Sequence, residues 1–182
     1  SLTLAVAGQS IGGTFSFEQL TLPGPTSALT DDIRVIKVGI TNGELALGDG
    51  DTDFVTLTEG RGGFILTNAG IAGDFSVTVG LNIPGAVDFD GAFRVMINNT
   101  TTEVSEDIVV NGETIELRLP AGPYLKVEGG ADPNPPIEMT VFGQTLRGRF
   151  AFEQYNASAS PQAPAGTPPQ KLVRIAISDL EF

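Results

Sequence analysis

The chain has 182 residues and contains neither cysteine nor histidine. Without cysteine there is no disulfide, no thiolate metal site and no cysteine nucleophile. Without histidine there is no Ser-His-Asp triad and no imidazole metal ligand. Tryptophan is also absent and tyrosine occurs only twice, which leaves little of the aromatic surface on which sugars stack. We therefore expect a protein that is not an enzyme and that carries no organic cofactor.

Positive charge is scarce as well. Ten lysines and arginines stand against 22 aspartates and glutamates, for a net charge of −12. Nucleic-acid binding needs clustered lysine and arginine, and an anionic membrane surface would repel such a chain. No apolar run reaches the roughly 18 residues of a membrane span. We expect no nucleic-acid partner and no membrane span, and a surface suited to a secreted protein that can attract divalent cations.

What the sequence does contain is frequent glycine (23) and proline (12) between short alternating segments. Asp74–Ile83 alternates strictly between apolar and small or polar residues, which predicts a half-buried strand. The dipeptide Asn111-Gly112 stands between two such segments and predicts a hairpin. Similar alternation occurs in Leu2–Val6, Phe93–Asn98, Thr114–Leu119 and Ile137–Val141. Further turns are predicted at Asn42–Gly43, Gly48–Asp51 and Pro84–Gly85.

The sequence repeats itself at an offset of 135 residues. Leu4–Gln19 matches Met139–Gln154 at eight of sixteen positions, and Lys37–Leu45 matches Arg174–Phe182 two residues out of step. Loops of different composition separate the matched parts. We interpret residues 1–136 as one full β repeat and residues 137–182 as a partial second repeat that completes the sheet, within a longer tandem array.

Strands spaced about ten residues apart predict an all-β fold, an antiparallel meander folded as a β-sandwich. A β-solenoid or another stacked β array is the alternative, although its rungs would repeat every 20–30 residues or so. A smaller pattern, apolar-x-Gly-x-Phe-x-apolar, occurs four times, and its glycine predicts a close approach of a neighbouring ring or backbone. The predicted core includes Phe15, Phe17, Phe75, Phe93, Phe150 and Phe152. If the ring is buried, Phe150→Ala should cost about 3–5 kcal/mol.

Acidic residues supply the candidate sites. Asp49, Asp51 and Asp53 alternate in a glycine-containing turn, and calcium favours several oxygen ligands on such a loop. The glutamate of an EF-hand is missing, so a solubilising turn is the competing interpretation. Two further acidic groups could serve a glycosidase, which needs paired carboxylates, or could form a solvated acidic face. These groups are Asp88 with Asp90, and Glu103 with Glu106 and Asp107.

Two polar segments contain triplets that match the acceptor pattern for N-glycosylation. They fall within Asn98–Thr101 and Asn156–Ser158. We interpret both as ordinary polar loops.

Three longer motifs carry a resemblance. Leu117–Gly129 ("LRLPAGPYLKVEG"), Met139–Gln154 ("MTVFGQTLRGRFAFEQ") and Ala46–Gly50 ("ALGDG") resemble the tandem repeats of giant, adhesin-like bacterial surface or secreted proteins. The resemblance spans nearly the whole chain and implies an extracellular or cell-surface location in a stalk, adhesin or matrix. The chain departs from the pattern by inserting Ala131–Pro136 before the second copy.

Together these observations predict a non-enzymatic structural module that acts as a spacer or assembly unit. Its partners would be neighbouring copies of the same repeat, joined by strand pairing, and calcium is a candidate ligand. The competing hypothesis is an adhesin module that binds a glycan or a surface partner through loops such as Ala157–Pro169. A third is a glycan-cleaving enzyme dependent on Asp88.

Overall fold

The computed structural model describes residues 2–6, 9–22, 32–49, 51–157 and 170–182. Twelve strands and no helix occur in these ranges, so no described helix could cross a membrane. The strands are β1 Leu2–Val6, β2 Gln9–Leu22, β3 Ile33–Gly48, β4 Asp53–Thr67, β5 Gly70–Ile83, β6 Val87–Asn98, β7 Val104–Val110, β8 Glu113–Leu119, β9 Tyr124–Gly129, β10 Ile137–Val141, β11 Gln144–Ala157 and β12 Gln170–Glu181.

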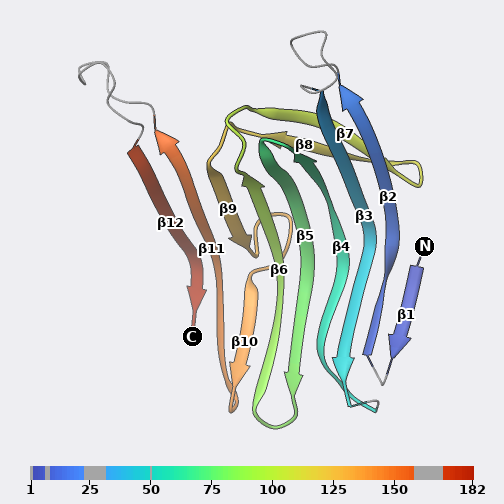
Figure 1. Cartoon of the computed structure of the whole chain (residues 1–182). Coiled ribbons are helices and arrows are strands. Elements are labelled where there is room, and N and C mark those ends of the chain that lie inside the picture. Colours follow the sequence, from blue (N-terminus) through green and yellow to red (C-terminus); the bar gives the residue numbers. More distant parts are fainter. Residues whose placement is uncertain (1, 7–8, 23–31, 50, 158–169) are drawn as a thin grey trace.

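Ten of the strands form one antiparallel sheet that runs as a meander from β1 at one edge to β12 at the other (Figure 1). The long strands β6 and β11 flank a position that two short strands share. There, β9 pairs with residues 93–98 of β6 and 150–154 of β11. The other short strand, β10, pairs with residues 87–90 of β6 and 144–148 of β11. The insertion Ala131–Pro136 lies between β9 and β10, so it interrupts what would otherwise be one strand.

The second layer is a single hairpin, β7–β8, that crosses one face of the sheet. Its turn has Asn111 at φ 49° and Gly112 at φ 86°, the left-handed pair that a two-residue hairpin turn requires. Salt bridges fix the hairpin to the sheet: Lys37 Nζ lies 2.8 Å from Glu106 Oε2, and Arg61 pairs with Glu113.

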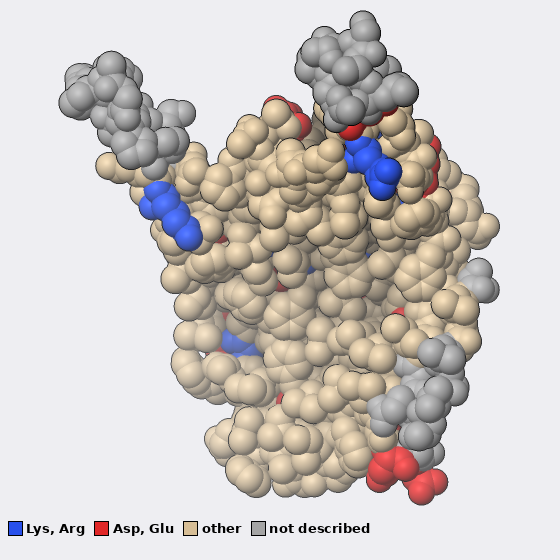
Figure 2. Space-filling model, viewed as in Figure 1, with Lys and Arg blue, Asp and Glu red and all other residues tan. Residues whose placement is uncertain are grey.

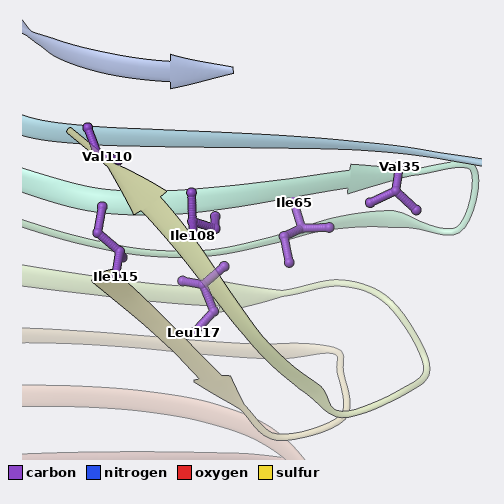
Figure 3. Packing of buried hydrophobic residues seen from close by; sticks show 6 residues of the cluster. All are labelled: Val35, Ile65, Ile108, Val110, Ile115 and Leu117. Carbon is purple, nitrogen blue, oxygen red and sulfur yellow. The ribbon is translucent and has the colours of Figure 1, made fainter. Parts of the chain in front are cut away.

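The main core lies between this hairpin and the sheet (Figure 3). Its members are Val35, Ile65, Ile108, Val110, Ile115 and Leu117. Gly39 and Gly63 lie beneath the hairpin and give it room, because a Cβ on Gly39 would lie 2.3 Å from the Val110 side chain and one on Gly63 would lie 2.8 Å from Ile108. A smaller cluster continues beyond it with Ala72, Met96, Leu119 and Tyr124.

The all-β antiparallel meander is as the sequence predicts. Asp74–Ile83 lies within β5, and Asn111-Gly112 joins β7 to β8. The predicted turn at Asn42–Gly43 is wrong. Asn42, at φ 51°, lies inside β3 where the pairing register shifts, so the left-handed residue forms a bulge within a long strand.

The predicted phenylalanine core is also wrong. Phe15, Phe17 and Phe150 are 47%, 68% and 37% exposed. These rings share one face of the sheet, as the alternation indicates, but the hairpin covers the opposite face. Alternation shows which side chains lie together, and the position of the second layer decides which face is buried.

Candidate functional site

The three strands at one edge of the sheet, β1–β3, pair with one another in the same way as the three at the other edge, β10–β12. In β1–β2, Leu2 pairs with Gly13 and Val6 pairs with Gln9. In β10–β11, Ile137 pairs with Gly148 and Val141 pairs with Gln144. All five residue pairs of the first hairpin recur in the second when 135 is added to each number.

The third strand follows the same rule. Phe15 pairs with Ile40 in β2–β3, and Phe150 pairs with Ile177 in β11–β12. The register shift between Gly12 and Thr14 recurs between Arg147 and Arg149. The matched sequences therefore adopt the same pairing, the same bulge and the same place in a meander. The division into a full repeat and part of a second one stays a prediction.

The two copies differ in their neighbours. The outer sides of β10 and β11 pair with β6 and β9, whereas the described part of the chain places no strand beyond β1 and β2. On the other side, β3 pairs with β4, whereas β12 ends the sheet. The edge formed by β1 and β2 therefore corresponds to β10 and β11, which are paired within this chain. Likewise, the edge formed by β12 corresponds to β3, which is paired with β4.

The two faces of the sheet differ sharply in polarity. We call the face to which Phe15, Phe64, Phe75, Phe93 and Phe150 point the apolar face, together with the residues that alternate with them along the same strands. Away from the strand ends, its described side chains are apolar, glycine or glutamine. This face is turned to the viewer in Figure 2, where charged side chains are sparse.

Rings on the apolar face lie against glycines of the neighbouring strand. A Cβ on Gly73 would lie 2.3 Å from the Phe64 ring, and a Cβ on Gly129 would lie 2.4 Å from the Phe150 ring. The close approach that the Gly-x-Phe pattern predicts is therefore confirmed at Gly73. Each of these rings therefore covers the backbone of the glycine on the neighbouring strand.

The opposite face, which carries the hairpin, holds a polar basin of about 660 Å³. Arg94 donates two hydrogen bonds to Asp74, at 2.9 and 2.5 Å. These hydrogen bonds are the main reason that the pKa of Arg94 is raised. Lys126 Nζ lies 2.7 Å from Glu128 Oε1. The basin is lined by paired charges, which suits hydrogen bonding to a hydroxylated ligand more than acid–base chemistry.

The predicted calcium residues Asp49, Asp51 and Asp53 lie in and beside the β3–β4 turn. The Asp49 carboxylate accepts the N–H groups of Thr52 and Asp51 at 2.9 and 3.0 Å, and these bonds lower its pKa. Within the described ranges, no three acidic side chains are arranged to hold a metal ion. Asp49 thus has a structural task in the turn, and calcium stays a prediction.

The other acidic groups are spread out. Asp88 and Asp90 are exposed on the polar side of β6, outside the basin. On β7, Glu106 binds Lys37, and Asp107 accepts a 2.7 Å hydrogen bond from Arg118. Glu103 precedes β7 and is exposed. The loop Ala157–Pro169, on which the adhesin hypothesis depends, lies outside the described residues from position 158 onward.

Sequence reasoning missed the role of Asn98, which it assigned to a polar loop. Asn98 is fully buried. Its amide donates to the carbonyl oxygens of Thr102 and Pro120, both at 2.8 Å, and its oxygen accepts from the N–H and hydroxyl of Thr100 at 2.9 and 2.7 Å. One side chain therefore ties the end of β6 to both sides of the hairpin. The only sequence signal is a polar cluster after an alternating segment.

Comparisons with protein-family models, with curated proteins and with solved structures find no match to this chain.

Proposed function

We propose that the chain is a structural repeat module that assembles by strand pairing between successive repeats. The observation that carries the proposal is the recurrence of the β1–β3 pairing in β10–β12. A unit that ends with the strands with which it begins can be continued by the same joint. The resemblance to bacterial surface proteins supports an extracellular spacer or filament as the setting.

The joint has a defined register. Met139 pairs with Phe89, and Phe150 pairs with Gly129. By the 135-residue offset, Leu4 of one repeat would pair with Phe89 of the repeat before it, and Phe15 would pair with Gly129. Main-chain hydrogen bonds along an open edge are a general way to add a strand, and an unpaired edge is otherwise an aggregation hazard.

At the other edge of the sheet, β12 lacks two glycines that β3 has. Ala176 takes the place of Gly39, and Leu180 takes the place of Gly43. A Cβ on Gly39 would meet Val110 at 2.3 Å, and one on Gly43 would meet the Gly60 backbone at 3.1 Å. A repeat that continues from β12 would therefore differ from this one, with a smaller or shifted hairpin.

The test is a two-repeat chain in which residues 1–135 precede the full sequence. The second copy then takes the place of β10–β12 with its native glycines. Array stability grows with the number of coupled repeats, so we expect one cooperative thermal transition above that of the single chain. The control joins two full chains by a flexible Gly/Ser linker and should melt below the two-repeat chain. Equal melting temperatures of the two chains would contradict the proposal.

The polar basin favours a second candidate, a module that binds a glycan. Its walls combine Arg94, Asp74, Lys126 and Glu128 with Thr78, and such side chains offer both donors and acceptors to sugar hydroxyls. A glycan-array signal that Arg94→Ala abolishes and Arg174→Ala retains would support it. Arg174 is exposed on β12, away from the basin.

A further inference from the structure

The apolar face has no second layer over it among the described residues. Large apolar side chains therefore reach solvent across the sheet, from Phe17 on β2, through Val95 on β6, to Ile175 on β12. Their exposed fractions are 68%, 37% and 71%. Contiguous apolar surface of this extent marks an interaction site in a soluble protein.

The chain exposes more surface than a compact monomer of its size. A compact monomer of 19.0 kDa exposes about 8,400 Å². This chain exposes 11432 Å², which is about 3,000 Å² more. A standard stable interface buries about 1,200–2,000 Å² in total, counted over both partners. This excess is counted over the whole chain. On the apolar face itself, exposed fractions of 47–71% are found for Phe15, Phe17, Val173, Ile175 and Ile177, and two copies that cover each other's face would bury these side chains.

The shape of the face suits another sheet. Stacked sheets lie about 10 Å apart with their side chains interdigitated. The rings of Phe64 and Phe75, with centroids 6.2 Å apart, stack beside each other across β4 and β5, and the Phe64 ring rests over Gly73. Side chains that lie low over the backbone leave a surface that a second sheet can approach.

The charges at the strand ends select the orientation. Arg34 and Lys171 lie on the apolar face, near the same end of the sheet, and both are exposed. Asp49, Asp51 and Asp53 are exposed at the opposite end of β3, and acidic atoms are visible at that end of this face (Figure 2). A two-fold axis perpendicular to the strands would bring Arg34 of one copy over the acidic β3–β4 turn of the other.

We propose that the apolar face is the interface with the same face of a second copy, strands opposed, so that two sheets form a β-sandwich. This inference concerns the face of the sheet, whereas the proposed function concerns its edges, and either can hold without the other. Face pairing gives a closed dimer. Edge pairing gives open chains whose length increases with protein concentration.

The test measures the mass of the full chain by sedimentation over a range of concentrations. We expect a dimer of twice 19.0 kDa. Val95→Lys places a charge in the middle of the face and should weaken the dimer by at least ~10-fold in Kd. Asp90→Lys is the matched control, on the same strand but the opposite face, and should leave the dimer intact.

A second pair of variants keeps the proposal testable if Val95→Lys does not fold. Arg34→Glu alters only an exposed strand end and should weaken the dimer about 3-fold or more at low salt, and adding Asp53→Lys should restore it. A chain that stays monomeric at all concentrations would overturn the proposal. So would sedimentation of that monomer with phosphatidylcholine vesicles, because lipid would then be the partner of the face.

Discussion

Asn42 on β3 and Asp179 on β12 have the same left-handed backbone, with φ of 51° and 52°. They are equivalent residues of the two matched sequences, and each begins a two-residue bulge opposite a glycine, Gly13 or Gly148. Asparagine and aspartate are the residues that enter this region most readily. The repetition therefore extends from the sequence to a specific irregularity of the backbone.

The first prediction concerns the hairpin core. Leu117 is fully buried between the hairpin and the sheet, so Leu117→Ala should lower the free energy of unfolding by about 2–5 kcal/mol. Val109 lies on the outer side of the same hairpin and is 58% exposed. Val109→Ala should cost less than about 1 kcal/mol. Urea unfolding of both variants measures these changes. Equal losses in the free energy of unfolding would show that the hairpin is not the second layer.

The phenylalanine face leads to a revised expectation. Phe150 is 37% exposed, so Phe150→Ala should cost about 1–2 kcal/mol in the monomer, below the 3–5 kcal/mol of a buried ring. Urea unfolding at dilute protein measures this value. A loss that grows with protein concentration would indicate that the ring enters the dimer interface, whereas a loss above about 3 kcal/mol at high dilution would restore the original core assignment.

Asn98 provides the third prediction. Asn98→Ala would leave the carbonyl oxygens of Thr102 and Pro120 without the donor that the buried Asn98 side chain supplies. We expect a loss of about 2–4 kcal/mol of stability. Asn82 is exposed near the end of β5, and Asn82→Ala serves as the control within about 0.5 kcal/mol. Thermal unfolding of the two variants with similar midpoints would refute the role assigned to Asn98.

The β3–β4 turn should respond to acid. Because the pKa of Asp49 is lowered in the folded state, its contribution to stability is present above the unfolded pKa, near 3.8, and is lost as pH falls through the folded value. The difference in Tm between wild type and Asp49→Ala should be largest at neutral pH and shrink below about pH 4. Asp51→Ala is the control, because Asp51 donates its backbone N–H to Asp49 and this hydrogen bond does not involve the Asp51 side chain. A pH-independent difference would contradict this account.

Local pattern was enough to predict the strands and the hairpin but not their packing. The alternation of Asp74–Ile83 and the Asn111-Gly112 turn are local properties, and both predictions are confirmed. Asn42-Gly43 has the same turn chemistry but lies within a strand, because β2 and β4 pair on both sides of it. Likewise, nothing local distinguishes the alternation of Phe15 and Phe17 from that of Ile115 and Leu117. Only the hairpin's crossing of one face separates exposed rings from buried aliphatic side chains.

The most direct test of repeat pairing is amide hydrogen exchange in the two-repeat chain, at the second copy's Phe15–Gln19. In the single chain, no strand among the described residues pairs with the N–H groups of this segment that point away from β3, so they lie on an open edge. In the two-repeat chain they would take the place of Phe150–Gln154, which pair with Gly129 and its neighbours on β9. We predict that these amides become as protected as those of Phe150–Gln154 in the single chain. Exchange as fast as on the open edge would contradict the assembly of repeats by strand pairing.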